Sequence, residues 1–421
     1  MRTRGVAANS AFALAGDLAG KGGLLAVMMV AARGLPTPEF ALFATVAALA
    51  TVLSAVLDGG SQMLLTRDGV AGAHARARLL TALALARLPL LAACLLVAVA
   101  GGFALGRPLE AFGVVALAAA GAAQLTLTGT LRSAQDLRPE AMAKLLSGIL
   151  QLAGAVICVA AAPSAAALLL LLAGAMMLSN VPLFVAVRRQ TSRSGPPASR
   201  FATLRRAVPL GVMALATLAY YRSGTIVLSW LSTPAQTARF ATASTVAWGM
   251  LCVGNAVTTG LLPRLSAAAP EDRDAILVRS LKWLTGFSTV MALGVVVLAR
   301  PMLTVIFGAR YATAAPTLDI LVVATALIAP AGVIGTGLVA QRRLRPVAVQ
   351  VALSLSINLV VLIALAPVLG APGAALATLA CEGVGLGVLV AAVCRPRIGR
   401  SPARFALAAT PTAGALARSG R

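Results

Sequence analysis

The stretch NSAFALAGDLAGKGGLLAVMMVAA, residues 9–32, decides how this chain must fold. It is apolar almost throughout and long enough to cross a bilayer as a helix. It nevertheless contains Asp17 and Lys21, which are four residues apart and therefore share one face of that helix. An ionised group in mid-bilayer costs at least ~2.5–3.5 kcal/mol, so such groups normally face a partner or a wet cavity. The stretch therefore predicts a membrane helix with a polar face.

The rest of the chain has the same apolar character. Of its 421 residues, 59% are hydrophobic and only 11% are charged, and the mean hydropathy is +0.93. A soluble domain carries about 25% charged residues, so the surplus of apolar surface indicates lipid as the solvent. The alternating segments of about ten residues that are typical of membrane barrels are absent. We predict an all-α polytopic membrane protein.

Twelve apolar runs have the length of a membrane span. The first six are 9–32, 40–58, 79–103, 111–131, 143–162 and 165–187, and the second six are 208–231, 240–262, 281–299, 317–340, 346–366 and 371–393. We therefore expect a six-helix lobe over 1–187, a basic linker over 188–206, a second six-helix lobe over 207–394 and a basic tail over 395–421.

The two lobes are expected to be repeats of one another. Phe40-Ala41 and Thr45-Val46-Ala47, in the second span, recur 200 residues later as Phe240-Ala241 and Thr245-Val246-Ala247. Six spans per lobe preserve orientation, so the repeat is parallel and its pseudo-twofold axis runs along the membrane normal. The substrate site would then lie between the lobes near the midplane.

The basic residues predict the orientation. If the N-terminus is cytoplasmic, 27 of the 35 lysines and arginines fall in cytoplasmic segments and only five in external loops. This bias predicts that both termini are cytoplasmic (N-in, C-in). On a soluble protein the net charge of +23 would suggest nucleic acid. Here topology and anionic lipid explain the charge, and we expect no nucleic-acid partner.

No enzyme motif is present in the sequence. GxxxxGK[ST], GxSxG and HExxH do not occur. The five cysteines lie in or at the ends of apolar spans without CxxC spacing, and the single histidine, His74, lies in a basic loop. We therefore expect no catalytic residues, no metal site and no cofactor.

Charged residues inside the spans are the candidate site residues. Lys21 and Arg222, in the first span of each lobe, and Arg87 would bind the head group of an anionic substrate. Lys21 could instead form a structural ion pair with Asp17, and Arg87 could extend to the membrane surface. Asp17 and Glu382 are candidates for coupling transport to a proton or sodium ion. The alternatives are that Asp17 only pairs with Lys21 and that Glu382 is a protonated acid hydrogen-bonded between helices.

Several segments of the chain resemble a known family. They are Asn9, Ala32-Arg33-Gly34-Leu35, Glu39-Phe40-Ala41-Leu42-Phe43, Leu57-Asp58-Gly59-Gly60, the stretch from Pro234 to Ala243, Leu262-Pro263-Arg264-Leu265, Phe307-Gly308-Ala309-Arg310-Tyr311 and Leu369-Gly370-Ala371-Pro372-Gly373-Ala374-Ala375-Leu376-Ala377-Thr378. Together they resemble the polysaccharide-transport branch (O-antigen-flippase-like, Wzx-type) of the multidrug/oligosaccharidyl-lipid/polysaccharide (MOP) exporter superfamily. Two features depart from the family. Ser223 and Gly224 follow Arg222 where relatives often have an acidic residue, and the chain has twelve predicted spans where the superfamily's lipid II flippases have fourteen.

The resemblance implies a flippase in a surface-glycan or exopolysaccharide pathway. Such a protein moves an undecaprenyl-diphosphate-linked oligosaccharide, or exports a polysaccharide precursor, across the cytoplasmic (inner) membrane by alternating access. The implied partners are the lipid-linked glycan, the lipid bilayer, and a polysaccharide polymerase or glycosyltransferase.

Two other functions stay open at this point. A multidrug or lipid exporter of the same superfamily would favour an apolar, acid-lined cavity over a cationic one. A membrane glycan polymerase or acyltransferase would need a large external loop with catalytic side chains. The longest predicted external loop, 300–316, contains neither an acid nor a histidine, which disfavours the enzyme.

Overall fold

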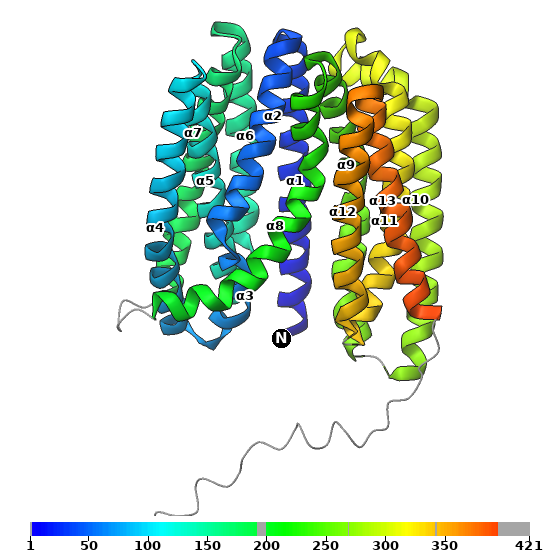
Figure 1. Ribbon diagram of the computed structural model, residues 1–421. Helices are drawn as coiled ribbons and strands as arrows, with labels where there is room; N and C mark the ends of the chain where they lie inside the picture. The colour runs from blue at the N-terminus through cyan, green and yellow to red at the C-terminus, as the bar shows by residue number, and fades with distance from the viewer. Residues whose placement is uncertain (1, 192–198, 268, 342, 395–421) are drawn as a thin grey trace, which may run out of the picture.

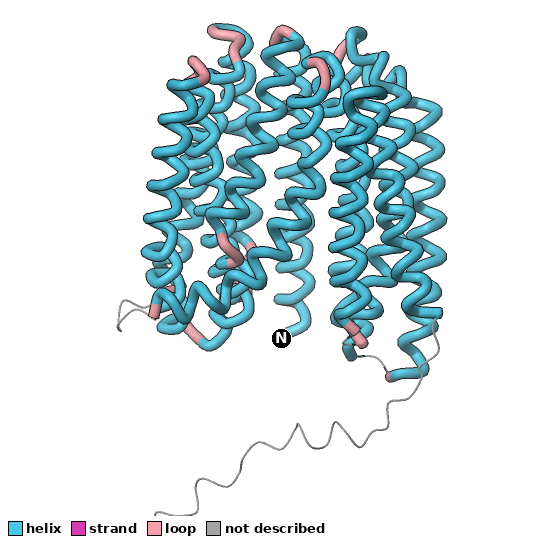
Figure 2. Tube along the Cα trace, viewed as in Figure 1, coloured by secondary structure: helices cyan, strands magenta, loops and turns pink. Residues whose placement is uncertain are grey.

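The computed structural model describes residues 2–191, 199–267, 269–341 and 343–394 (Figure 1), so part of the predicted linker and the whole predicted tail lie outside the described residues. Helices make up nearly all of the described chain (Figure 2). The first bundle contains α1 (Arg2–Gly34), α2 (Thr37–Asp58), α3 (Ser61–Asp68), α4 (Ala73–Ala104), α5 (Pro108–Ser133), α6 (Arg138–Ala161) and α7 (Ala165–Gln190). The second contains α8 (Arg200–Leu231), α9 (Pro234–Ala267), α10 (Pro270–Phe307), α11 (Ala315–Ala340), α12 (Leu344–Leu369) and α13 (Ala371–Cys394). Two 3₁₀ turns, η1 (Gly69–Ala71) and η2 (Ala309–Ala314), join helices.

The all-helical prediction is confirmed, with two differences in detail. Eleven of the described helices are long and apolar enough to cross a membrane, against the twelve spans predicted. The predicted span 240–262 lies inside α9, which is a helix of 34 residues but is not one of the eleven. The sequence analysis also missed α3, which starts directly after the second span. Gly59 and Gly60 adopt positive φ angles of 53° and 81° there, and the Asp58 carboxylate accepts a hydrogen bond from the Gln62 backbone N–H.

The two lobes share one packing pattern, as the predicted parallel repeat requires. In the first lobe α1 packs on α6, α2 on α5, α5 on α4 and α7, and α6 on α7. In the second lobe α8 packs on α12, α9 on α11, α11 on α10 and α13, and α12 on α13. Each of these five contacts of the first lobe thus has its counterpart in the second.

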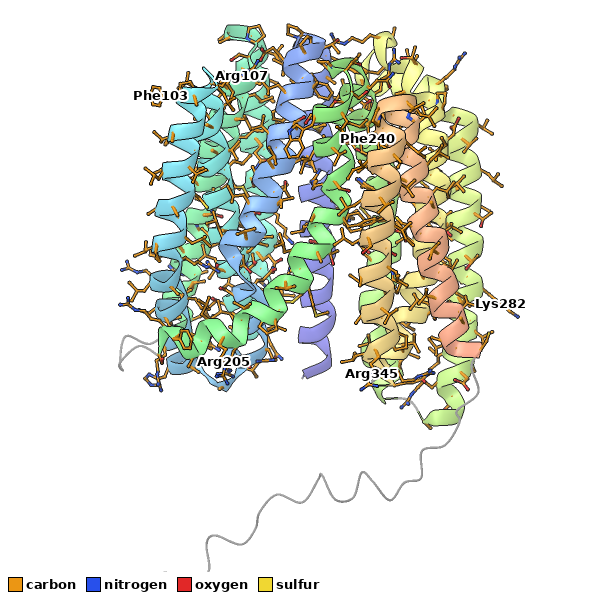
Figure 3. All side chains as sticks on the ribbon, in the orientation of Figure 1. Phe103, Arg107, Arg205, Phe240, Lys282 and Arg345 are labelled. Atoms are coloured by element: carbon orange, nitrogen blue, oxygen red, sulfur yellow. The ribbon has the colours of Figure 1, made fainter. Side chains whose placement is uncertain are left out.

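The described ends of the chain lie at one end of the molecule, which we call the terminal end; the opposite end is the far end (Figure 1). Figure 3 shows the side chains of Arg205 and Arg345 at the terminal end and those of Phe103 and Arg107 at the far end. That the terminal end is cytoplasmic remains a prediction from the basic residues.

The lobes touch at the terminal end through α8. This helix begins beneath the first lobe and rises into the second (Figure 1), and it packs against α2, α3 and α4. A Cβ atom on Gly60 would lie 2.2 Å from the carbonyl oxygen of Ala207 and 2.4 Å from the nitrogen of Gly211. Nearby, Arg206 forms an ion pair with Asp68, and a hydrogen bond from Arg67 holds the pKa of Asp68 below its ordinary value. Only glycine allows α8 to approach the α2–α3 turn so closely.

The lobes also touch at the far end, where Phe40 packs against Tyr311 and two arginines each cap a helix of the other lobe. Arg33, at the end of α1, donates to the carbonyls of Val305 and Ile306 at the end of α10, the latter at 3.1 Å. Arg310, in η2, donates to carbonyls at the end of α1 and just beyond it, those of Ala32 and Leu35, the latter at 2.9 Å. The last carbonyls of a helix lack partners within the helix and carry partial negative charge. Each arginine therefore supplies hydrogen-bond donors that the capped helix cannot supply itself.

We expect these reciprocal caps to hold the far end closed. A hydrogen bond to a charged group contributes about 1.5–3 kcal/mol, so Arg310→Ala should raise the fraction of far-end-open molecules about ten-fold or more. The measurement is the electron–electron distance between spin labels at Ala162 and Thr313, on opposite lobes, in a variant without native cysteines.

Arg300→Ala is the matched control for this experiment. Arg300 is an exposed arginine of α10 with no ion pair or hydrogen bond from its side chain to another described residue. A distance distribution that is the same for Arg310→Ala, Arg33→Ala and Arg300→Ala would show that the caps do not hold the far end closed.

Candidate functional site

A cavity of about 260 Å³ lies between the two lobes. Helices α1, α2, α5, α6 and α7 line it from the first lobe, and α8 and α9 line it from the second. Arg222 of α8 is the one charged residue among those that line it. The predicted interlobe position of Arg222 therefore coincides with a cavity that both lobes build.

The Arg222 guanidinium has no partner among the residues that the structure describes: no hydrogen bond or ion pair joins it to another of them. The polar lining around it consists of hydroxyl and amide groups, namely Thr51, Ser54, Gln151, Thr225, Ser244 and Thr245. Thr51 and Thr245 donate their protons to helix carbonyls at 2.8 and 2.7 Å. Their oxygens remain as acceptors, but the cavity offers Arg222 no anion. An unpaired guanidinium is suited to bind a phosphate or carboxylate in bidentate fashion.

Lys21 lies on α1 almost one turn before Leu24, which lines the interlobe cavity. Its side chain is exposed, and the structure gives it no partner within the described residues. The alternative ion pair with Asp17 is not formed. Asp17 instead accepts a hydrogen bond from Lys144 of α6 at 2.5 Å.

Asp17 belongs to a network of four charged side chains. The Lys144 ammonium also contacts Glu140, at 2.8 Å, and Arg132 of α5 forms a fork on the same carboxylate at 2.6 and 3.0 Å. This network joins α1, α5 and α6, and a Cβ atom on Gly23 of α1 would lie 2.7 Å from the Cα atom of Gly148 of α6. The position of Asp17 is thus that of a packing contact, and its predicted role in ion coupling has no geometric support here.

Arg87 lies inside the first lobe and does not reach the interlobe cavity. Its guanidinium contacts a carboxylate oxygen of Asp58 at 2.9 Å and donates to the Asp58 carbonyl at 2.8 Å and to the Thr126 hydroxyl. The Arg87 and Asp58 side chains are only 18% and 7% exposed. Removing one partner of such a buried pair leaves the other charge buried and unpaired, which lowers the folding stability by about 3–5 kcal/mol. This geometry favours a structural role for Arg87 over head-group binding.

Glu382 lies in a second cavity, of about 570 Å³, inside the second lobe. The residue is 6% exposed, and the hydroxyl of Tyr220 donates to its carboxylate at 2.5 Å. The thiol of Cys381 donates in turn to the Tyr220 hydroxyl at 3.2 Å. Glu382 is the one charged residue among those lining this cavity, so its carboxylate faces a hollow instead of being wholly enclosed between helices.

The sequence analysis missed the polar residues that accompany Glu382. Gln350 and Ser354 of α12 line the same cavity, and the Ser223 hydroxyl donates to the side-chain oxygen of Asn358 at 2.8 Å. Gln350, Ser354 and Asn358 follow one another at intervals of four residues in the predicted span 346–366. That spacing places them on one helix face and could have indicated a polar site. In the described part of the chain, no group of three or more His, Cys, Asp or Glu residues could hold a metal ion.

One short stretch of α8 serves both cavities. Tyr220 and Tyr221 line the cavity of the second lobe, whereas Arg222 and Thr225 line the cavity between the lobes. Successive residues of an α-helix point about 100° apart, since 3.6 residues make one turn. Helix α8 is therefore the wall that separates the acid-lined cavity from the cationic one.

No model of a known protein family matches the sequence, and no curated protein sequence does. Solved structures match over most of the chain. The lipid II flippase MurJ, in an inward closed conformation, matches with a TM-score of 0.71 and 13% identity over 91% of this chain and 87% of that one. An inward-facing multidrug resistance MATE family transporter of the MOP superfamily matches with a TM-score of 0.64 and 13% identity over 88% and 94%. The Vibrio cholerae MATE transporter VcmN, in its bent form, matches with a TM-score of 0.55 and 15% identity over 93% of this chain and 96% of that one. At these identities the likeness is one of fold, and the chain has the fold of these MOP-type transporters.

Proposed function

We propose that the chain is a membrane transporter that flips an undecaprenyl-diphosphate-linked oligosaccharide, or a polysaccharide precursor, across the cytoplasmic (inner) membrane by alternating access. Arg222 carries the proposal, because it is a cation without a described partner in a cavity between two lobes. A diphosphate would supply the missing anion. Guanidinium binds phosphate through two parallel hydrogen bonds, and the attraction is strong where water is scarce.

Lys21 is the second head-group residue in this proposal. It lies beside the interlobe cavity, on the side of Leu24 that is nearer the N-terminus of α1. If the terminal end is cytoplasmic, as the basic residues predict, an incoming diphosphate would meet Lys21 before Arg222. The ammonium is free to bind it, since Asp17 is engaged by Lys144.

Glu382 is the proposed coupling residue, for a proton or a sodium ion. Its carboxylate faces the cavity of the second lobe, and its hydrogen bond to Tyr220 links it to the helix that carries Arg222. Loading an ion onto Glu382 would therefore change the packing of α8 two residues before the proposed head-group site.

The name of one structural neighbour is compatible with a lipid-linked substrate. MurJ is described as a lipid II flippase, and its TM-score is the higher of the two compared inward states. In this proposal the partners that supply or consume the glycan are a glycosyltransferase and a polysaccharide polymerase.

A multidrug exporter is the second candidate, and the cavity of the second lobe favours it. That cavity is the larger of the two, and its lining has two tyrosines and the Glu382 carboxylate. Aromatic faces and a carboxylate suit an organic cation. Transport of a cationic dye that depends on Glu382 but not on Arg222 would support this candidate over the flippase.

We expect Arg222→Ala to impair flipping far more than folding. The loss of a charge-assisted contact of about 1.5–3 kcal/mol corresponds to roughly a ten- to hundred-fold lower rate at limiting substrate. The assay follows translocation of a lipid-diphosphate oligosaccharide in proteoliposomes, normalised to protein abundance. Lys21→Ala should show a smaller loss, because its side chain is exposed.

Arg300→Ala again serves as the matched control, and Arg222→Lys tests the need for the guanidinium fork. Normal flipping by both Arg222→Ala and Lys21→Ala at normal abundance would contradict the assignment of these two residues to head-group binding.

Glu382→Gln should uncouple flipping from the proton or sodium gradient. Glutamine keeps a side-chain oxygen that can accept from Tyr220 but cannot take up or release a proton. We expect the variant to fold and to lose the stimulation of flipping by an imposed proton or sodium gradient. Tyr220→Phe keeps the carboxyl group but removes the hydrogen bond that links it to α8, so it should weaken that stimulation. Stimulation unchanged in Glu382→Gln would remove coupling from this residue.

A further inference from the structure

A groove that no part of the proposed transport cycle uses runs along the membrane-facing side of the first lobe. It joins two hollows, of about 550 Å³ and about 400 Å³, which share Val97, Ala98, Ala111 and Val114 in their linings. Helices α2, α4 and α5 form it from the first lobe. The C-terminal end of α8 and the N-terminal end of α9 close it from the second lobe. We call it the lateral groove. Helix α2 separates it from the interlobe cavity, because Ala41, Leu42 and their neighbours face the groove while Phe43 and Ala44 face the cavity.

The lateral groove has the depth of one bilayer leaflet. Its lining runs along α4 from Leu105, the residue just beyond its far end, down to Ala93. That distance is about 18 Å at 1.5 Å per residue, close to the ~15 Å that is half of a hydrocarbon core ~30 Å thick. Between these two residues the α4 lining is made of cysteine, alanine, valine and glycine, with no charged side chain below the mouth.

The mouth of the lateral groove carries interfacial residues. Arg107 lies at the far end (Figure 3), and Glu110 lines the groove with it, three residues further along α5. The structure shows no ion pair between the two, nor between either of them and another described residue. Trp230, on the opposite wall, is 73% exposed. Tryptophan is enriched at the level of lipid head groups.

We propose that the lateral groove binds one hydrocarbon chain of a zwitterionic aminophospholipid from the far-end leaflet, with the lipid phosphate on Arg107 and the ammonium on Glu110. Three observations meet in this assignment: an apolar groove one leaflet deep, its opening toward lipid, and two unpaired opposite charges at its mouth. A purely anionic head group would satisfy Arg107 but would lie against the Glu110 carboxylate.

The second lobe contributes a wall to the lateral groove, so the bound lipid contacts both lobes. Trp230 and Ser229 of α8 and Pro234 of α9 face the chain from that side. A lipid held there would favour the arrangement in which the lobes are close at the far end, the same arrangement that the Arg33 and Arg310 caps stabilise. The assignment does not depend on which substrate the transporter moves.

Tryptophan quenching by brominated lipids tests the proposal directly. One variant keeps Trp230 as its only tryptophan (Trp248→Phe, Trp283→Phe), and a second keeps Trp283 (Trp230→Phe, Trp248→Phe). Trp283 is 55% exposed on α10, outside the lateral groove, and so reports on the surrounding lipid. Both are reconstituted in phosphatidylcholine vesicles containing equal fractions of phosphatidylethanolamine or phosphatidylglycerol, brominated near the head group.

We expect Trp230 to be quenched more strongly by brominated phosphatidylethanolamine than by brominated phosphatidylglycerol, and Trp283, which lies beside Lys282, to show no such excess. Gly101→Leu should abolish the excess at Trp230, because a Cβ atom there meets open space in the groove and the larger side chain would fill it. Gly294→Leu is the matched control, since Gly294 is a helical glycine of α10 that is equally open but lies outside the groove. Glu110→Gln should remove the preference for phosphatidylethanolamine.

Three results would overturn the proposal. Equal quenching of Trp230 by the two lipids would remove the head-group assignment, and retained excess in Gly101→Leu would remove the groove as its location. Release of the quenching by a polyprenyl diphosphate, but not by unbrominated phosphatidylethanolamine, would assign the groove to the tail of the transported substrate instead. None of these readouts measures flipping, so they fail or succeed independently of the proposed function.

Discussion

The structure around the interlobe cavity depends on a single unpaired guanidinium, that of Arg222. A charge near the bilayer centre costs at least ~2.5–3.5 kcal/mol and is tolerated where it faces a partner or a wet cavity. No carboxylate lines the cavity beside Arg222; hydroxyl groups on α2, α8 and α9 do. The lobes therefore enclose a space that is polar enough to hold the cation but lacks its counter-ion.

Helix α8 connects this cavity to both lobes. Its first turns pack beneath the first lobe, where Gly60 and Gly211 allow backbone contact, and its later turns carry Tyr220 and Arg222 between the two cavities. Because one helix contacts both lobes, rocking one lobe against the other has to move the Arg222 side chain relative to the first lobe. The reciprocal caps of Arg33 and Arg310 mark the far-end contact that such a motion breaks.

The sequence predicts what is local and misses what the fold brings together. Hydropathy and length were sufficient to predict the membrane-spanning helices. The Asp58-Gly59-Gly60 stretch was sufficient to predict where α2 ends. Their charge inside a predicted span was sufficient to select Arg222 and Glu382 as candidates, because an ionisable residue in a membrane is costly and normally faces a partner or a wet cavity. The pairing of Asp17 with Lys144, 127 residues away, has no local signal. An acid four residues from a lysine on one helix looked like its partner, yet the close packing of α1 on α6 supplied another. The lateral groove is likewise invisible in the sequence, because five helices contribute to it.

The partner found for Asp17 changes the balance of charge around the cavity. Paired with Lys21, Asp17 would have left Arg222 as a lone cation and the neighbourhood of Lys21 neutral. With Lys144 bridging Asp17 and Glu140, and with Arg132 also on Glu140, the two acids of that network are already matched by two cations. Lys21 and Arg222 then remain as two cations beside one cavity, and the larger acid-lined cavity cannot neutralise them because α8 stands between. Under the proposed function, a substrate with two negative charges close together, such as a diphosphate, would bind these two cations, whereas an organic cation would be repelled by them.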